Sequence, residues 1–131
     1  MVQRGFAFWF AATLWLAGAA SAQEQAQPEA GPQIYPALAA ALVAKGAPVI
    51  DLRRPDEIAQ TGLVEGAVNI LHTEIDAIAA LIGESKDRAV ILYCRSGRRV
   101  ASAIEALEAR GFGGLVNAGG YSHLTSALQG E

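Results

Sequence analysis

The feature that most constrains the fold is an uninterrupted apolar run, Ala89-Val90-Ile91-Leu92-Tyr93. Successive side chains of a strand point to opposite faces of its sheet, so five apolar residues in a row predict a strand covered on both faces. Strands of this kind lie at the centre of parallel sheets, whose two faces are packed with helices. The run therefore predicts an α/β fold with a parallel sheet.

The rest of the chain alternates between short strand-like and helix-like segments, as expected for such a fold. Four further strands are expected, at 34–35, 48–52, 66–70 and 115–117. Helices are expected at 36–44, 55–60, 98–110 and 121–129, and another is opened by Thr73, with Asp76 as its capping-box partner, and closed by Gly83. These segments predict a small parallel sheet of five strands with helices on both faces, in one domain over 34–129.

The N-terminus has the anatomy of a secretory signal peptide. Arg4 precedes an uncharged apolar run from Phe6 to Ala20, and Ala20-Ser21-Ala22 forms a small-x-small cleavage site. The run is shorter than the ~20 apolar residues that a membrane span needs. We expect cleavage after residue 22, a flexible leader over 23–33, and a periplasmic or secreted protein with no stable membrane contact after cleavage.

Charge and cysteine content exclude several classes of function. Ten basic and 13 acidic side chains give a net charge of −3, so the basic surface of a nucleic-acid-binding protein is absent. The single cysteine excludes an internal disulfide and any CxxC site. His72 and His123 lie far apart and lack metal-ligand spacing. We expect no metal and no cofactor. His72 is expected to be solvated or to cap a helix, and His123 is expected to have a structural role.

The cysteine lies at the default functional position of an α/β sheet, the carboxyl end of a strand. It begins the segment Cys94-Arg95-Ser96-Gly97-Arg98-Arg99, which leads into a helix. Inward-facing backbone N–H groups, the helix N-terminus and three arginines all favour an anion, and here they favour the thiolate, which is the nucleophile. Cys94 is the predicted catalytic residue, and the predicted substrate-binding residues are Arg95, Ser96, Gly97, Arg98 and Arg99.

Three motifs, in order, resemble the rhodanese-like sulfurtransferases. The segment C-R-S-G-R-R is similar to the family's C-x-x-G-x-R active-site loop. Residues 49–70 (VIDLRRPDEIAQTGLVEGAVNI) resemble its D-x-R-x-P-x-E to G-A-x-N-I signature, and residues 117–121 (NAGGY) resemble its late Gly-Gly turn. The chain most resembles the single-domain periplasmic rhodaneses of the phage-shock protein E type. Leu63, Leu71 and His123 depart from the usual pattern, all outside the active loop.

The resemblance implies a rhodanese-like fold and a two-step sulfur transfer. Thiosulfate, or another sulfane-sulfur donor, would leave a persulfide on Cys94, and cyanide or a thiol would accept that sulfur. Asp51 and Arg53 match the family's D-x-R and would support the loop, while Glu57 is expected to be a first-turn or salt-bridge residue. The alternative from another class is a sulfur-carrier or regulatory module without turnover.

A phosphatase or arsenate reductase is disfavoured by loop length. Enzymes of that kind with a rhodanese-like fold separate cysteine and arginine by five residues, whereas four separate Cys94 from Arg99. The smaller ring of N–H groups suits one sulfur atom better than a tetrahedral phosphate.

Overall fold

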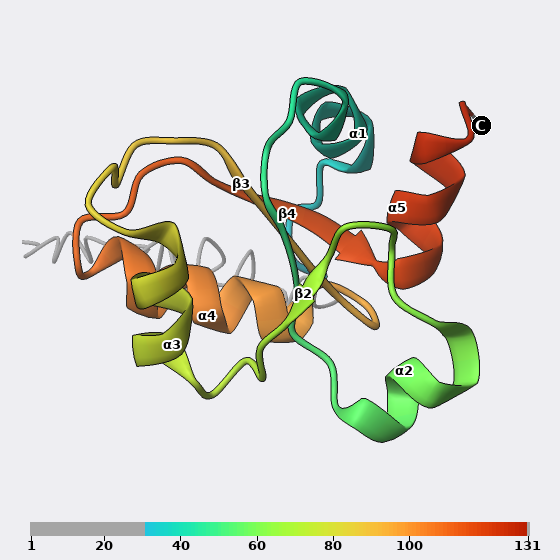
Figure 1. The fold of residues 1–131 in the computed structure, drawn as a ribbon, viewed down its shortest axis with the longest axis horizontal. Coiled ribbons are helices and arrows are strands. Elements are labelled where there is room, and N and C mark those ends of the chain that lie inside the picture. The colour runs from blue at the N-terminus through green and yellow to red at the C-terminus, as the bar shows by residue number, and fades with distance from the viewer. Residues whose placement is uncertain (1–30, 131) are drawn as a thin grey trace, which may run out of the picture. The chain divides into compact units, whose positions relative to one another are not determined.

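The computed structural model describes residues 31–130, and the predicted signal peptide and most of the predicted leader lie outside this range. The described residues form an α/β fold (Figure 1). Its strands are β1 (Val49–Asp51), β2 (Val68–Asn69), β3 (Val90–Cys94) and β4 (Leu115–Gly120). Its helices are α1 (Pro36–Ala44), α2 (Pro55–Thr61), α3 (Ile75–Ile82), α4 (Arg98–Glu108) and α5 (Tyr121–Leu128).

The sheet is parallel throughout, with strand order β2-β1-β3-β4. All five residues of β3 are buried, which confirms a central strand covered on both faces, although the strand lies one residue later than predicted, at Val90–Cys94 instead of Ala89–Tyr93. Alternate residues of β3 enter two separate cores: Val90, Leu92 and Cys94 pack in one, and Ile91 and Tyr93 in the other. The α/β class and the parallel sheet are therefore as predicted.

Helices cover both faces of the sheet, also as predicted. Residues of α3 and α4 complete the first core, and residues of α1 and α5 complete the second. Figure 1 shows α3 and α4 on one side of the strands and α1 on the other, with α2 beyond the carboxyl end of β1. The segments that follow the four parallel strands all leave from the carboxyl ends of the strands, which brings together parts of the chain that are far apart in the sequence.

The predicted fifth strand at 34–35 is wrong for the described residues, since the sheet there has four strands. Tyr35 makes one strand-like contact, with its N–H donating to the Asn117 carbonyl of β4 at 2.7 Å. Pro36 then begins α1 at once, and proline has no N–H with which to continue a ladder. The backbone of Tyr35, at ψ 62°, has already left the extended conformation.

Four helix boundaries differ from the predictions by one or two residues: α2 ends at Thr61 and α5 at Leu128, and the start of α3 and the end of α4 also differ. Thr73 does not cap α3: the N-cap is Glu74, whose side chain makes no cap bond and instead accepts the Leu71 N–H at 3.2 Å. The helix expected to reach residue 110 ends at Glu108. Gly83 ends α3 with a positive φ of 78°, as predicted.

Candidate active site

Cys94 is the last residue of β3, so the chain turns away directly after the sulfur. Its side chain has no exposed surface and belongs to the core formed with α3 and α4. Sγ accepts the backbone N–H of Gly97 at 3.0 Å. The three residues 95–97 therefore close over the sulfur before α4 begins at Arg98. The same arrangement aims the N-terminus of α4 towards the thiol, which favours negative charge there.

Gly97 is required by both conformation and space. Its φ of 96° lies in the left-handed region, which residues with a side chain rarely adopt. A Cβ added there would lie 2.9 Å from Ile34 Cγ2 and 3.2 Å from Asn117 Oδ1. The glycine thus allows the turn that presents its own N–H to the sulfur.

The Gly-Gly segment at the carboxyl end of β4 supports this loop. Asn117 is buried, and its amide donates to the Gly97 carbonyl at 3.0 Å while its Oδ1 accepts the Gly119 N–H at 2.9 Å. The backbone of Gly120 lies so close to the Arg95 carbonyl that an added Cβ would collide with it. Asn117 is thus a positioning residue that we did not single out from the sequence, although it lies within the N-A-G-G-Y motif.

His123 caps the turn rather than entering the site. Its Nδ1 accepts the Gly120 N–H at 2.8 Å at the start of α5. The other histidine, His72, lies in the loop between β2 and α3, with its backbone N–H donating to the Leu52 carbonyl at 3.3 Å. Its Nδ1 is buried and has no hydrogen-bond partner in the described part of the chain.

Arg99 is held by Glu57 of α2, forty-two positions earlier in the chain. The guanidinium meets the carboxylate through two bonds, NH1 to Oε2 at 2.7 Å and NH2 to Oε1 at 2.8 Å. The Arg54 N–H also donates to Glu57 Oε2, at 2.9 Å. The bonds from Arg99 lower the pKa of Glu57 from 4.5 to about 2. Glu57 is therefore the salt-bridge residue that the sequence predicted, and its partner lies in the first turn of α4, directly after the Cys94 loop.

The ion pair with Glu57 also favours the charged form of Arg99. Hydrogen bonding to Glu57 is the main cause that raises the pKa of Arg99, and the neighbouring Cys94 adds a smaller contribution. The bonds to Glu57 hold the guanidinium at the first turn of α4, directly after the Cys94 loop. Arg99 links α2 to the loop and supplies positive charge at the thiol.

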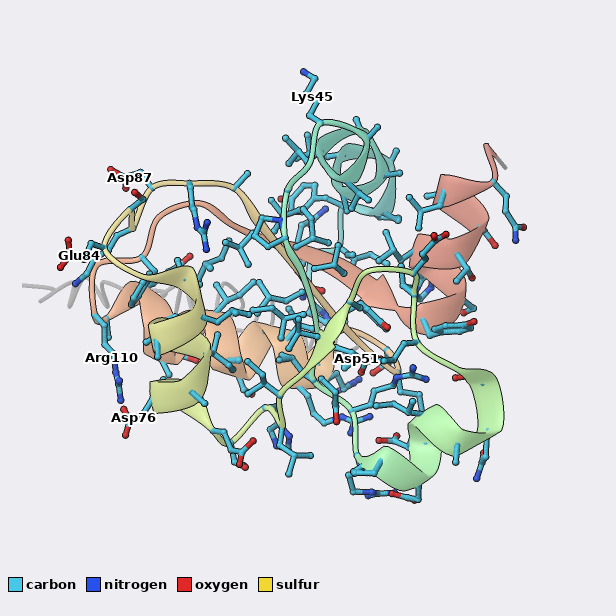
Figure 2. All side chains as sticks on the ribbon, in the orientation of Figure 1. Lys45, Asp51, Asp76, Glu84, Asp87 and Arg110 are labelled. Carbon is cyan, nitrogen blue, oxygen red and sulfur yellow. The ribbon has the colours of Figure 1, made fainter. Side chains whose placement is uncertain are left out.

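Asp51 and Arg53 form a buried ion pair that organises the turn after β1. Arg53 NH2 lies 2.7 Å from Asp51 Oδ2, with the two side chains 3% and 0% exposed. Arg53 also donates to Thr61 Oγ1 at 2.7 Å and to the Gly62 carbonyl at 2.9 Å, and its guanidinium lies 4.8 Å from the centre of the Tyr121 ring. In Figure 2 Asp51 is labelled within the molecule, near the carboxyl end of the strands. The pair thus joins β1 to the end of α2 and supports the wall of the site.

The remaining loop side chains face solvent. Arg95, Ser96 and Arg98 are exposed, and within residues 31–130 none of the three forms a side-chain hydrogen bond or an ion pair. A pocket of about 180 Å³ separates the loop from α2, lined by Arg53, Glu57, Gln60, Thr61 and Arg95. Wider hollows, such as one of about 340 Å³ beside α4, lie away from these groups and contain no nucleophile.

The described residues contain no group of three or more His, Cys, Asp or Glu side chains arranged to hold a metal ion. In the same range, no helix has the length and apolar character needed to cross a membrane. The site described above is a thiol with a backbone N–H donor and a guanidinium nearby, a class of site in which a cysteine can act as a nucleophile.

Comparison with known proteins agrees with this class. The family model of the rhodanese-like domain matches residues 35–127, and the chain belongs to that family. It is 37% identical over 71 residues to the thiosulfate sulfurtransferase PspE of Escherichia coli strain K12, covering 54% of this chain and 67% of that protein. It is 32% identical over 79 residues to the rhodanese domain-containing protein CG4456 of Drosophila melanogaster, covering 52% and 71%.

A solved structure extends the likeness to the fold. The human single-domain sulfurtransferase TSTD1 superposes with a TM-score of 0.55 at 26% identity, covering 74% of this chain and 96% of that one. Family membership and the parallel sheet are thus established together.

Proposed function

We propose that the protein is a thiosulfate sulfurtransferase that carries sulfane sulfur as a persulfide on Cys94. The observation that carries this proposal is the placement of the single sulfur at the end of β3, where Sγ accepts the Gly97 N–H at 3.0 Å beside the charged Arg99. The names of two of the relatives, the thiosulfate sulfurtransferase PspE and the single-domain sulfurtransferase TSTD1, support the same activity.

In the first step the Cys94 thiolate attacks the outer sulfur of thiosulfate. A bond forms between Sγ and that sulfur, the bond from that sulfur to the sulfonate breaks, and its electron pair leaves with sulfite. The donor is a dianion, so Arg95 and Arg98, exposed and unpaired among the described residues, favour its approach. The loop N–H groups stabilise the new persulfide anion as they stabilise the thiolate.

In the second step a nucleophile such as cyanide or a thiolate attacks the outer sulfur of the persulfide. That sulfur leaves with the acceptor, and Cys94 returns as the thiolate. The cycle needs no second cysteine and no redox cofactor, because no net oxidation occurs in the protein. It is nucleophilic catalysis with a preactivated sulfur.

The proposal is tested by the intact mass of the protein after incubation with thiosulfate. We expect the mass to rise by one sulfur atom, with one equivalent of sulfite released, and we expect Cys94→Ser to show neither change. Ser85→Ala, a change at an exposed residue between α3 and β3, serves as the matched control and should load normally. Wild-type protein that gains no sulfur and releases no sulfite would overturn the proposal.

The alternative is a carrier that accepts sulfur from a partner without rapid turnover, and the complete burial of Cys94 is the observation that favours it. Steady-state turnover with thiosulfate and cyanide separates the two functions. Turnover well above the rate of a single loading event supports the enzyme, whereas loading without turnover supports the carrier.

The cellular site is a further part of the proposal, and it rests on the sequence of residues 1–22. We propose export and cleavage after Ala22, which would make the protein periplasmic or secreted. The mass of the protein purified from a cell's exported fraction tests this, since cleavage would leave Gln23 as the first residue.

A further inference from the structure

A histidine side chain helps to begin α5. Gly120 is the N-cap of this helix and His123 is its third residue, and the Gly120 N–H donates to His123 Nδ1 at 2.8 Å. In a capping box, a glutamate or glutamine at this third position accepts the N–H of the N-cap residue. His123 replaces that permanent acceptor by one that exists only while the imidazole is neutral, because both nitrogens of a charged imidazole carry protons.

Gly120, the donor of this bond, also lies directly beside the nucleophile. It is the last residue of β4, and its Cα is the partner of the Cys94 Cα in the ladder between β3 and β4. Its backbone approaches the Arg95 carbonyl so closely that no Cβ would fit. Figure 1 shows that β4 runs into α5 without a loop between them. The bond to His123 therefore holds the backbone segment that borders Cys94 and Arg95.

Each of the two adjacent glycines gives its N–H to a different kind of acceptor. Gly119 donates to the amide oxygen of Asn117 at 2.9 Å, and this acceptor does not titrate. Gly120 donates to His123, an exposed residue that solvent protons can reach. A proton on this imidazole removes the acceptor, and it places a positive charge at the N-terminus of α5, where the helix dipole disfavours cations.

We propose that His123 is a positioning residue that makes sulfur loading of Cys94 depend on pH, with the neutral imidazole as the active form. The inference rests on the proposed function, because it concerns the rate at which Cys94 takes up sulfur. When the imidazole gains a proton, the Gly120 N–H faces a second donor and loses its bond. The Gly120 backbone then holds the Arg95 carbonyl less firmly, and the Cys94 loop presents the sulfur less well.

The elements that pack against α5 carry few groups that titrate near neutral pH. These elements are α1, β4 and β3, and neither α1 nor β4 contains an ionisable side chain. The other ionisable side chains on β3 and α5, and the charged side chains against them, are Cys94, Tyr93, Tyr121, Asp51, Arg53 and Arg99. Carboxylates, guanidinium groups and tyrosines do not ordinarily change charge between pH 5 and pH 8, whereas histidine does. The pH response therefore has two candidate sources, His123 and Cys94 itself.

The test compares the rate of sulfur loading from thiosulfate in the wild-type protein and in His123→Gln. Glutamine is a usual capping-box residue and keeps a neutral acceptor at every pH. Ionisation of Cys94 affects both proteins alike, so the ratio of the wild-type rate to the variant rate isolates the effect of His123. We expect this ratio to be about one near pH 7.5 and to fall about fivefold by about pH 5.5, as for the loss of one hydrogen bond.

Further measurements assign the effect to the bond with Gly120. His123→Ala has no acceptor at any pH, so it should load about fivefold more slowly than wild type near pH 7.5 and as fast as wild type near pH 5.5. His72→Gln removes the other histidine and should keep the wild-type pH profile. In the wild-type protein, the protection of the Gly120 amide against hydrogen exchange, measured by NMR, should fall about fivefold over this range relative to the Gly119 amide.

A ratio of wild-type to His123→Gln rates that is the same at both pH values would overturn the inference. An unchanged protection of the Gly120 amide relative to the Gly119 amide would also overturn it, and this measurement decides if the glutamine variant does not fold. Either result leaves the proposed function standing, because Cys94 still takes up sulfur. Wild-type protein that takes up no sulfur at either pH refutes the proposed function itself, while the amide measurement still tests the bond to His123.

Discussion

Replacing Glu57 by glutamine tests whether a long-range ion pair holds the active-site loop. The carboxylate accepts two bonds from Arg99 and one from the Arg54 N–H, at 2.7, 2.8 and 2.9 Å. Glutamine keeps the shape and one acceptor but removes the charge and cannot accept at its nitrogen. The variant therefore loses the charge-assisted contact between α2 and the start of α4.

The size of the effect follows from the pKa of Glu57. A pKa of about 2, against 4.5 ordinarily, corresponds to about 3 kcal/mol in favour of the ionised carboxylate in the folded protein. The side chains of Arg99 and Glu57 are 23% and 13% exposed, so water screens part of this attraction. We expect Glu57→Gln to lower the free energy of unfolding at pH 7 by about 1–3 kcal/mol.

The pH dependence of stability separates the contribution of the Glu57 charge from the contribution of its packing. Because the pKa is depressed in the folded state, this stabilisation is complete above the ordinary value of 4.5 and is lost as the pH falls towards about 2. The difference between wild type and Glu57→Gln, measured by urea unfolding, should fall by about half or more between pH 7 and pH 3. Glu65→Gln removes an exposed acid that has no ion pair among the described residues and should change stability by less than about 0.5 kcal/mol. Equal effects of the two variants, or a Glu57→Gln effect that is undiminished at pH 3, would refute the reasoning.

Three further variants probe the supports of the loop. Gly97→Ala should lower the melting temperature more than Gly46→Ala and should abolish sulfur loading. Both glycines have positive φ, at 96° and 93°, but of the two an added Cβ meets neighbouring atoms only at Gly97. Similar melting temperatures for the two variants would show that steric crowding at Gly97 is unimportant. Asn117→Ala should cost about 2 kcal/mol in chemical unfolding and slow loading, because it removes two buried hydrogen bonds, and normal loading would show that the loop needs no such support. Arg53→Met should lower the free energy of unfolding by about 3–5 kcal/mol, because it leaves the buried carboxylate of Asp51 without its partner. Arg54→Met breaks an exposed ion pair and should lower it by at most about 1 kcal/mol. Comparable losses for the two variants in denaturant titrations would contradict the burial argument.

Local sequence patterns predicted most of the fold, because they depend on near neighbours in the chain. The run at 89–93 predicted the central strand, Pro36 predicted the start of α1, and Gly83 predicted the end of α3. The prediction of a fifth strand was wrong. Two apolar residues are enough to match a strand pattern in the sequence, but the single hydrogen bond from Tyr35 to β4 does not form a paired strand. The prediction that Thr73 caps α3 was wrong because the spacing of a capping box also occurs where another residue occupies the N-cap.

The sequence indicated where the candidate site lies, but it did not show which side chains contact one another there. Position at a strand end and the residues around Cys94 were enough to identify the loop. The sequence did not show which arginine would be paired, since Arg99 binds a carboxylate forty-two residues away, whereas Arg95 has no ion pair within residues 31–130. The role of Asn117 was equally hidden, because only the folded chain brings its amide to the Gly97 carbonyl.

The most direct test of the central claim is a crystal structure of the protein after treatment with thiosulfate. The account predicts a second sulfur bonded to Cys94 Sγ, lying within about 3.5 Å of backbone N–H groups of residues 95–99 and facing Arg99. An unmodified thiol in protein that has released sulfite, or the transferred sulfur bound at another residue, would contradict it.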